Sequence, residues 1–216
     1  MAFRSAGERR GTPADLLVVG LGNPGAEYAG TRHNVGAEVV DLLAARHGGR
    51  LKAGKERALV AEVRIGAGRV VLAFPQTYYN DAGLAAAALL RRHGVDDLRR
   101  LVVVHDEMDL PIGKLKVKVG GGLAGNNGLK SIKAHLHSDD FVRVRLAIGK
   151  PAGRQQGVDR QGVGGNGAVG QHQQRRAAAH RRRRFVADSL DGDPESFIGG
   201  VVEVDAMMRV ATAGIG

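Results

Sequence analysis

Short apolar runs recur along the chain, and their lengths and periods predict strands. Leu16–Val19 and Leu101–Val104 are uninterrupted apolar runs, which are typical of strands buried on both faces. Residues 58–65 alternate apolar and polar side chains, and a glycine turn separates them from a second apolar run at 69–74. We therefore predict a β-hairpin over 58–74.

Three helices are predicted from apolar residues that recur every three or four positions. The first begins near Thr31, a residue type suited to the N-cap, and carries its apolar stripe on Val35, Val39 and Leu43. The second and third are expected over 82–93 and 129–137.

Length and composition restrict the class of protein. The chain has 216 residues, of which 43% are hydrophobic, so it can form one globular domain with a sizeable core. It contains no cysteine, which excludes disulfides, thiolate catalysis and cysteine-bound metals. The leading residues are polar and no apolar run could span a bilayer, so we expect a cytoplasmic protein without a membrane partner. The net charge of +10 favours a polyanionic partner, and a merely solvated basic surface is the alternative.

A glycine-rich turn, GLGNPG, follows the first predicted strand and holds Asn23 at its carboxyl end, where open α/β sheets bind ligands. The same letters match the dinucleotide fingerprint G-x-G-x-x-G. That interpretation is disfavoured because Pro24 lacks the N–H that a pyrophosphate would need. Asp41, at the spacing for a ribose contact, falls inside the first predicted helix.

His33 and Asp106 are candidates for acid-base chemistry. His33 lies in the first turn of the first predicted helix, where the helix dipole disfavours protonation of the imidazole, as suits a general base. The alternative is a helix-capping role. Asp106 follows the apolar run 101–104 and would face His33 if that strand lay beside 16–19. A solvated acidic loop is the alternative.

Two further asparagines stand where a loop gives way to a predicted helix. Asn80 follows the hairpin, where an N-cap is the ordinary role. Asn127 closes the glycine-rich segment 120–128, which can bring backbone close to a ligand. Either amide could contact a substrate.

Basic residues follow a strand period in the run KLKVKV, which places Lys114, Lys116 and Lys118 on one face. Arg143 and Arg145 repeat this spacing further along the chain. Such cations suit contacts to phosphates, which give affinity without reading base identity. A soluble sheet face is the alternative.

Four sequence blocks, in this order, resemble the bacterial-type peptidyl-tRNA hydrolase family. They are GLGNPGAEYAGTRHNVG, PQTYYNDAG, HDEMDLPIGKLKVKVGGG with GNNGLKSI, and FVRVRLAIGKP. The resemblance implies a single-domain α/β/α sandwich with a mixed twisted sheet, in agreement with the elements above. It also implies an enzyme that hydrolyses the ester between a peptide and the 3′-terminal ribose of tRNA, without metal or cofactor and as a monomer.

The resemblance also implies roles for individual residues. His33 matches the catalytic base and Asp106 the carboxylate that orients it. The substrate-binding positions are Asn23, Tyr28, Tyr79, Asn80 and Asn127, and the positions that meet the tRNA acceptor arm are Lys116, Lys118 and Arg145. Because the ester is already activated, a base, a positioned water and amide donors should suffice. A non-catalytic RNA-binding or splicing-partner relative is the alternative.

The chain departs from the family pattern at Leu123 and Asn126, where a histidine is usual, and at Tyr79, where methionine is usual. The larger departure is residues 154–216, which begin rich in arginine, glycine and glutamine. We expect residues 1–14 to be a disordered extension, 15–153 the catalytic domain and 154–216 an aberrant, disordered segment. Our hypothesis is a reading-frame shift near residue 154 that could inactivate the chain, and an arginine-rich RNA-binding arm is the alternative. Translating the coding DNA in its other two frames would test it.

Overall fold

The fold is built on one mixed sheet whose seven strands, in the described part of the chain, have the order β2-β3-β4-β1-β5-β7-β6. The computed structural model describes residues 13–149 and 194–213. The β4-β1-β5-β7 strands are parallel, and the β2–β3, β3–β4 and β6–β7 pairs are antiparallel. The strands are β1 (Leu16–Gly20), β2 (Lys52–Ala53), β3 (Ala58–Ile65), β4 (Gly68–Pro75), β5 (Leu101–Glu107), β6 (Leu115–Val119) and β7 (Val142–Ala147).

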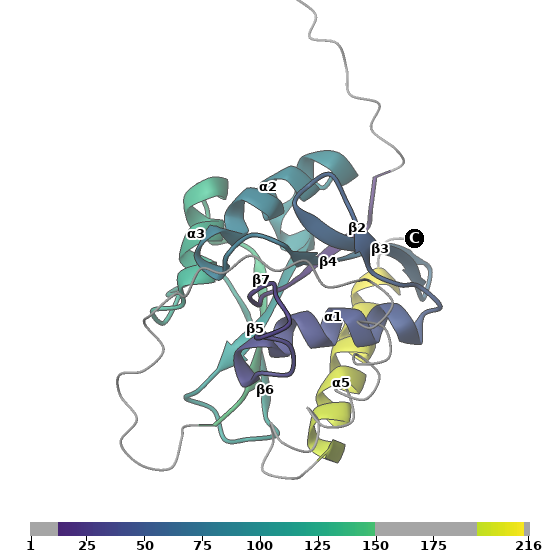
Figure 1. Cartoon of the computed structure of the whole chain (residues 1–216). Helices are drawn as coiled ribbons and strands as arrows, with labels where there is room; N and C mark the ends of the chain where they lie inside the picture. The colour runs from purple at the N-terminus through teal and green to yellow at the C-terminus, as the bar shows by residue number, and fades with distance from the viewer. Residues whose placement is uncertain (1–12, 150–193, 214–216) are drawn as a thin grey trace, which may run out of the picture.

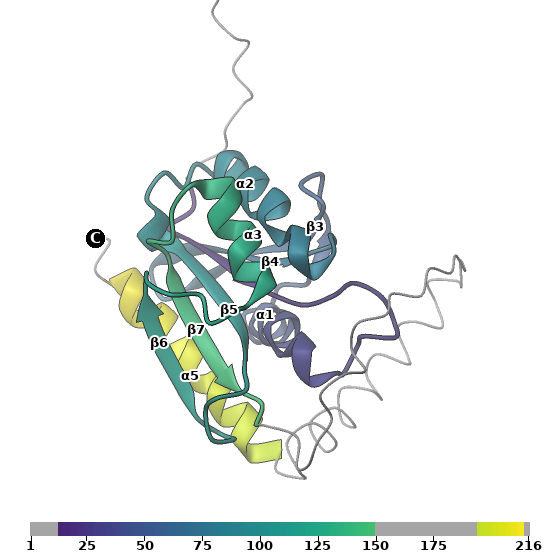
Figure 2. The same ribbon diagram turned by 90° about the vertical axis from the view of Figure 1, so that its left-hand side faces the viewer.

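Helices cover both faces of this sheet. They are α1 (Val35–Arg46), α2 (Ala82–His93), α3 (Asn127–Leu136) and α5 (Pro194–Ala213), with short 3-10 turns η1 (Arg32–Asn34), η2 (Tyr79–Asp81) and η3 (Leu98–Arg100). Figures 1 and 2 show α2 and α3 on one face and α1 and α5 on the other. The predicted α/β/α sandwich with a mixed sheet is therefore confirmed.

The alternating side chains of β1 divide the interior into two cores. Leu16 and Val18 pack in the cluster that includes α1 and α5, whereas Leu17 and Val19 pack in the cluster under α2 and α3. Burying each such side chain contributes roughly 1.5–3 kcal/mol relative to leaving it exposed. A strand apolar on both faces is therefore stable only between two helical layers, which is why its sequence is an unbroken apolar run.

Two glycines allow α1 to approach the sheet very closely. A Cβ atom on Gly20 would lie 2.1 Å from the carbonyl oxygen of Gly36, and one on Gly36 would lie 2.3 Å from the carbonyl oxygen of Val104. In the same region the Leu21 amide donates to the Val104 carbonyl at 2.9 Å. The start of α1 is thus held against the end of β5, and η1 with it.

The predicted hairpin forms as β3 and β4, paired in full register from Ala58↔Pro75 to Ile65↔Gly68. The first helix differs from the prediction, because α1 begins at Val35 and the preceding residues form η1. Thr31 makes no side-chain cap, since its hydroxyl donates to the Tyr28 carbonyl instead. No helix within residues 13–149 and 194–213 is long and apolar enough to cross a membrane.

At the N-terminus the expected extension over 1–14 needs a small correction. Ala14 is fully buried, and its amide donates to the His93 carbonyl at 2.9 Å. The Ala14 carbonyl in turn accepts from Arg100 at 2.7 Å. The folded unit therefore includes Ala14, while residues 1–12 lie outside the described residues.

The expectation that 154–216 is disordered is wrong for residues 194–213, which form α5. Val201, Val204 and Met208 of this helix are buried in the same core as α1. The spacing of these apolar residues, three and four positions apart, is a helical signal that the compositional bias of the preceding segment obscured. Residues 154–193 lie outside the described residues, so the reading-frame hypothesis stays a prediction.

Polar contacts fix α5 at two points. Asp205, almost fully buried, accepts from His47 Nε2 at 2.6 Å and lies 3.3 Å from Arg46 Nε, both at the end of α1. Near the last turn of α5, the Thr212 hydroxyl donates to the Ile65 carbonyl at 2.9 Å. These bonds set the rotation of the helix about its axis.

Replacing Asp205 with alanine should lower the free energy of unfolding by about 1–3 kcal/mol, because it leaves the partly buried His47 without its acceptor. Chemical denaturation of the full chain measures this. The matched control is Glu203→Ala on the exposed side of the same helix, which should change stability by no more than about 0.5 kcal/mol. Equal effects of the two substitutions would contradict the docking of α5.

Candidate active site

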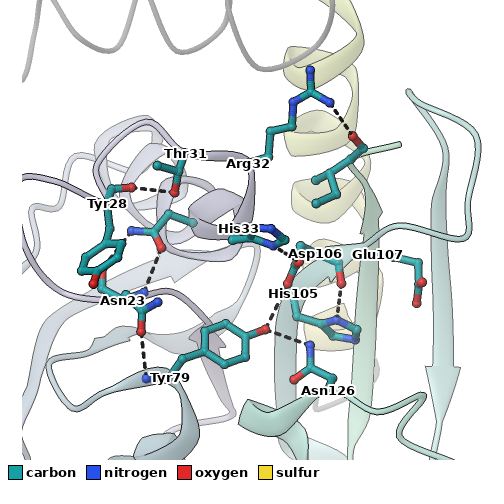
Figure 3. A network of polar contacts seen from close by, with 12 residues as sticks. Asn23, Tyr28, Thr31, Arg32, His33, Tyr79, His105, Asp106, Glu107 and Asn126 are labelled. Carbon is teal, nitrogen blue, oxygen red and sulfur yellow. Dashed lines mark hydrogen bonds and ion pairs between the residues drawn. The ribbon is translucent and has the colours of Figure 1, made fainter. Parts of the chain in front are cut away.

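The candidate site lies where the carboxyl ends of β1 and β5 meet the segments that follow them (Figure 3). The two strands are adjacent and parallel, so the turn with Asn23 and the end of β5 with Asp106 open at the same edge of the sheet. The turn η1 carries His33 to this edge, and η2 carries Tyr79. Four segments that are distant in sequence therefore converge.

His33 and Asp106 form a hydrogen-bonded pair. Nδ1 of His33 lies 2.7 Å from Oδ2 of Asp106, and the two side chains are 51% and 11% exposed. In the tautomer that donates Nδ1–H to the carboxylate, the imidazole carries its lone pair on Nε2. The arrangement can therefore take up a proton at Nε2 while the partly buried carboxylate holds the ring.

Asn34 fixes the turn that carries Asn23. The backbone N–H of Asn23 donates to Asn34 Oδ1 at 2.8 Å, and Asn34 Nδ2 donates back to the backbone carbonyl of Asn23 at 2.9 Å. The Asn23 side chain itself accepts from the Tyr79 backbone N–H at 3.0 Å, which commits Oδ1 and leaves the NH2 group as its donor. Sequence reasoning missed Asn34, although it stands next to His33 and is 4% exposed.

Tyr79 lies beside the pair. Its hydroxyl donates to Asp106 Oδ1 at 3.0 Å and accepts from Asn126 Nδ2 at 2.8 Å. Asn126 also caps α3, since its Oδ1 accepts from the Leu129 amide. Asn126 and Tyr79, two of the three positions that depart from the family pattern, thus contact each other, and Tyr79 also contacts Asp106. The expected contact of Tyr79 with substrate stays a prediction.

The other expected substrate positions surround this network. Asn80 follows Tyr79 in η2, and Asn127 follows Asn126 as the first residue of α3; both side chains are exposed. Tyr28 is partly buried in the loop after the Asn23 turn, and Figure 3 shows it on the Asn23 side of the network. The contact between Tyr79 and Asn126 brings the segments of Asn80 and Asn127 together.

Only some of the cations predicted to contact phosphates are accessible. Lys116 pairs in register with Arg145, and Lys118 with Arg143, so all four side chains project from the same face of β6 and β7. Both lysines are exposed. Arg143, however, is 2% exposed, and its guanidinium donates to the carbonyl groups of the glycine loop 120–122. The expectation that Arg143 faces phosphates is therefore wrong, because it braces the loop from inside.

Arg145 is engaged in an ion pair with Glu107. Its Nε and a terminal nitrogen lie 2.9 and 2.6 Å from one carboxylate oxygen of Glu107. Burial would raise the pKa of Glu107, but the Asp109 amide and the Arg145 guanidinium together lower the pKa below its usual value. A phosphate at Arg145 would thus share the guanidinium with Glu107.

His105 is the second histidine close to Asp106, and it is buried. Its Nδ1 lies 2.7 Å from the backbone carbonyl of Asp106, so Nδ1 carries the proton. Burial lowers the pKa of His105, which keeps this imidazole neutral. It therefore adds no positive charge beside the carboxylate of Asp106.

A half-open cavity of about 460 Å³ extends from Asn23 along α1 towards β3 and β4. Its walls combine polar and apolar side chains, among them Asn23, Asn34, Arg50, Leu59 and Phe74.

Among the described residues, no group of three or more histidines and carboxylates is arranged to hold a metal ion.

A family model and two relatives with similar sequences share one description. The family model described as peptidyl-tRNA hydrolase matches residues 17–160. The chain is 50% identical over 143 residues to the peptidyl-tRNA hydrolase of Frankia alni, across 66% of this chain and 72% of the relative. It is 51% identical over 150 residues to that of Kineococcus radiotolerans, across 66% and 75%.

Two solved structures with a similar fold carry the same name. A crystal structure of peptidyl-tRNA hydrolase from Acinetobacter baumannii is similar with a TM-score of 0.68 at 27% identity, covering 94% of this chain and 92% of that one. A mutant of the Acinetobacter baumannii protein is similar with a TM-score of 0.61 at 35% identity, covering 69% and 74%.

Proposed function

We propose that this chain, which belongs to the peptidyl-tRNA hydrolase family and is a hydrolase of that class, cleaves the ester between a peptide and the 3′-terminal ribose of tRNA through its His33–Asp106 pair. The observation that carries the proposal is the 2.7 Å contact between the two side chains at the edge of the sheet. Such a pair holds one tautomer of the imidazole and stabilises the imidazolium that forms during catalysis.

The reaction needs one water molecule and one base. Nε2 of His33 takes a proton from the water as the water oxygen attacks the ester carbonyl carbon. The π electrons of the carbonyl move onto its oxygen, which becomes the oxyanion of the tetrahedral intermediate. When the tetrahedral intermediate collapses, the bond to the ribose oxygen breaks and His33 returns the proton to that oxygen. The products are a peptide with a free carboxyl group and deacylated tRNA, and no covalent intermediate on the enzyme is required.

The asparagines supply the donors that this reaction needs. The Asn23 NH2 group, oriented by the bond between its Oδ1 and Tyr79, suits a contact to the developing oxyanion or to the first peptide carbonyl. Asn80 and Asn127 can engage the first backbone amide of the peptide. Because aminoacyl-tRNA has a free amine where peptidyl-tRNA has that amide, these contacts would spare it.

The tRNA part of the substrate would meet the basic strands. Lys116 and Lys118 are exposed on β6 and suit contacts to phosphates of the acceptor arm. Arg145 lies beside Lys116 and can add a phosphate contact while it remains paired with Glu107. We further propose a monomeric protein in the cytoplasm, where translation supplies this substrate.

The test is hydrolysis of N-acetylaminoacyl-tRNA and of free aminoacyl-tRNA by the full chain, followed as release of deacylated tRNA. We expect turnover of the blocked substrate and at least about a tenfold lower kcat/KM for the free one, since Asn80 and Asn127 would lose the backbone amide that they engage. Equal turnover of both substrates would contradict the role of the asparagines. Absence of turnover would contradict the proposed activity.

A further inference from the structure

The two carboxylate oxygens of Asp106 have different partners. Oδ2 faces His33 at 2.7 Å, and Oδ1 accepts from the Tyr79 hydroxyl at 3.0 Å. A carboxylate held at both oxygens cannot rotate about its last bond without losing one of them. The orientation of Asp106 towards His33 therefore depends on what holds Oδ1.

The hydroxyl of Tyr79 is itself held in place. It accepts from Asn126 Nδ2 at 2.8 Å, so its own proton points to Asp106. The ring packs against the backbone of Gly128, where a Cβ atom would lie 2.7 Å from a ring carbon. The backbone N–H of Tyr79 donates to Asn23. One residue thus joins the Asn23 turn, the end of β5 and the start of α3.

The phenol of Tyr79 keeps its proton near neutral pH. Burial, followed by the negative charge of Asp106, raises the pKa of Tyr79 well above its usual value. Tyr79 is therefore a permanent hydrogen-bond donor to the carboxylate rather than an acid or base in its own right. A donor of this kind withdraws negative charge from the carboxylate.

We propose that Tyr79, held by Asn126, is a positioning residue that sets how strongly Asp106 attracts the proton of His33. Tyr79 keeps Oδ2 of Asp106 directed at Nδ1 of His33. Its hydrogen bond also withdraws charge from the carboxylate, so the imidazole is less basic than it would be beside a carboxylate without that bond. This inference rests on the proposed role of the His33–Asp106 pair and concerns the range of pH over which His33 is a free base.

Other ionisable groups around the pair are the same in all variants described next. They include His105 and Glu107 on β5, Arg145 on β7, and Arg32 in η1, whose guanidinium donates to the Ile148 carbonyl. His105 is neutral, and the charges of Glu107 and Arg145 are paired with each other. Removing one hydroxyl from Tyr79 therefore isolates its effect on His33.

The experiment compares Tyr79→Phe with wild type in the full chain. The phenylalanine ring can keep the contact with Gly128, so only the two hydroxyl bonds are lost. The matched control is Tyr78→Phe, which removes a hydroxyl from the neighbouring tyrosine, 69% exposed. Two readouts are used: the pH profile of kcat/KM on N-acetylaminoacyl-tRNA, and NMR titration of the His33 imidazole, assigned with His33→Gln.

We expect the acidic limb of the pH profile, and the NMR midpoint, to move to higher pH in Tyr79→Phe by on the order of 0.5–1 unit, because the carboxylate regains charge and stabilises the imidazolium. We expect kcat to fall while KM changes little, and Tyr78→Phe to match wild type. Asn126→Ser, which keeps a capping oxygen but loses the donor to Tyr79, should shift the midpoint in the same direction by less.

An unchanged midpoint, or one that moves to lower pH, in Tyr79→Phe would overturn the proposal, as would the same shift in Tyr78→Phe. The NMR titration needs no substrate. If wild type fails to hydrolyse peptidyl-tRNA, the proposed function fails while the titration still decides whether Tyr79 acts on His33.

Discussion

Replacing His33 with glutamine is expected to lower kcat for N-acetylaminoacyl-tRNA by about 10²–10⁴-fold, the usual contribution of a positioned general base. Glutamine keeps a polar side chain of similar reach but has no nitrogen that can take up a proton near neutral pH. Steady-state hydrolysis at pH 7.5 measures kcat and KM, and we expect KM to change little. The control is His137→Asn, because this exposed histidine at the end of α3 has a positive φ that asparagine tolerates.

Asp106→Asn tests the second member of the pair. An amide can donate as well as accept, so an asparagine would donate to Nδ1 and favour the tautomer of His33 that carries its proton on Nε2. In that tautomer Nε2 has no lone pair with which to take a proton from water. We expect a loss of about 10³–10⁴-fold in kcat with an unchanged fold. If either variant retained wild-type turnover, the hydrolytic step would have to use another base.

Replacing Gly36 with alanine is expected to lower the free energy of unfolding by about 2–4 kcal/mol, the upper range for overpacking a close contact. Helix propensity alone predicts the opposite sign, since alanine in a helix is favoured over glycine by roughly 1 kcal/mol. The new methyl group, however, would lie 2.3 Å from the Val104 carbonyl and 2.7 Å from two backbone atoms of Leu21. Neither backbone can move without disturbing the sheet.

The matched control is Gly199→Ala in α5, where a Cβ atom would meet nothing within 4 Å. There we expect helix propensity to act alone and to raise stability by about 0.5–1 kcal/mol. Urea denaturation of the full chain measures both variants. Stabilisation by Gly36→Ala would contradict the close approach of α1 to β5. Because that approach carries η1, we also expect Gly36→Ala to lower turnover by displacing His33.

The corrections to the sequence-based expectations have a common cause. Arg143 has the alternation of a surface strand, but the glycine loop folds over it and buries it. Asn34 belongs to the first of the four sequence blocks, which assigned it no role, yet its side chain holds the Asn23 turn from eleven positions away. Residues of α5 were expected to be disordered because their neighbours are low in complexity, whereas the helix is stabilised by burial against α1. Each outcome depends on a partner that lies elsewhere in the chain.

By itself, the sequence determined the features that depend on neighbouring residues: the strand of β1, the β3–β4 hairpin, the helix over 82–93, and the residue types that match the family. These follow from side-chain periodicity and turn chemistry, which act over a few positions. Only the tertiary structure decided that Asp106 meets His33, 73 positions away, and that Tyr79 holds its other oxygen. Strand order and the burial of polar groups set those contacts, because a carboxylate removed from water must find its donors wherever packing brings them.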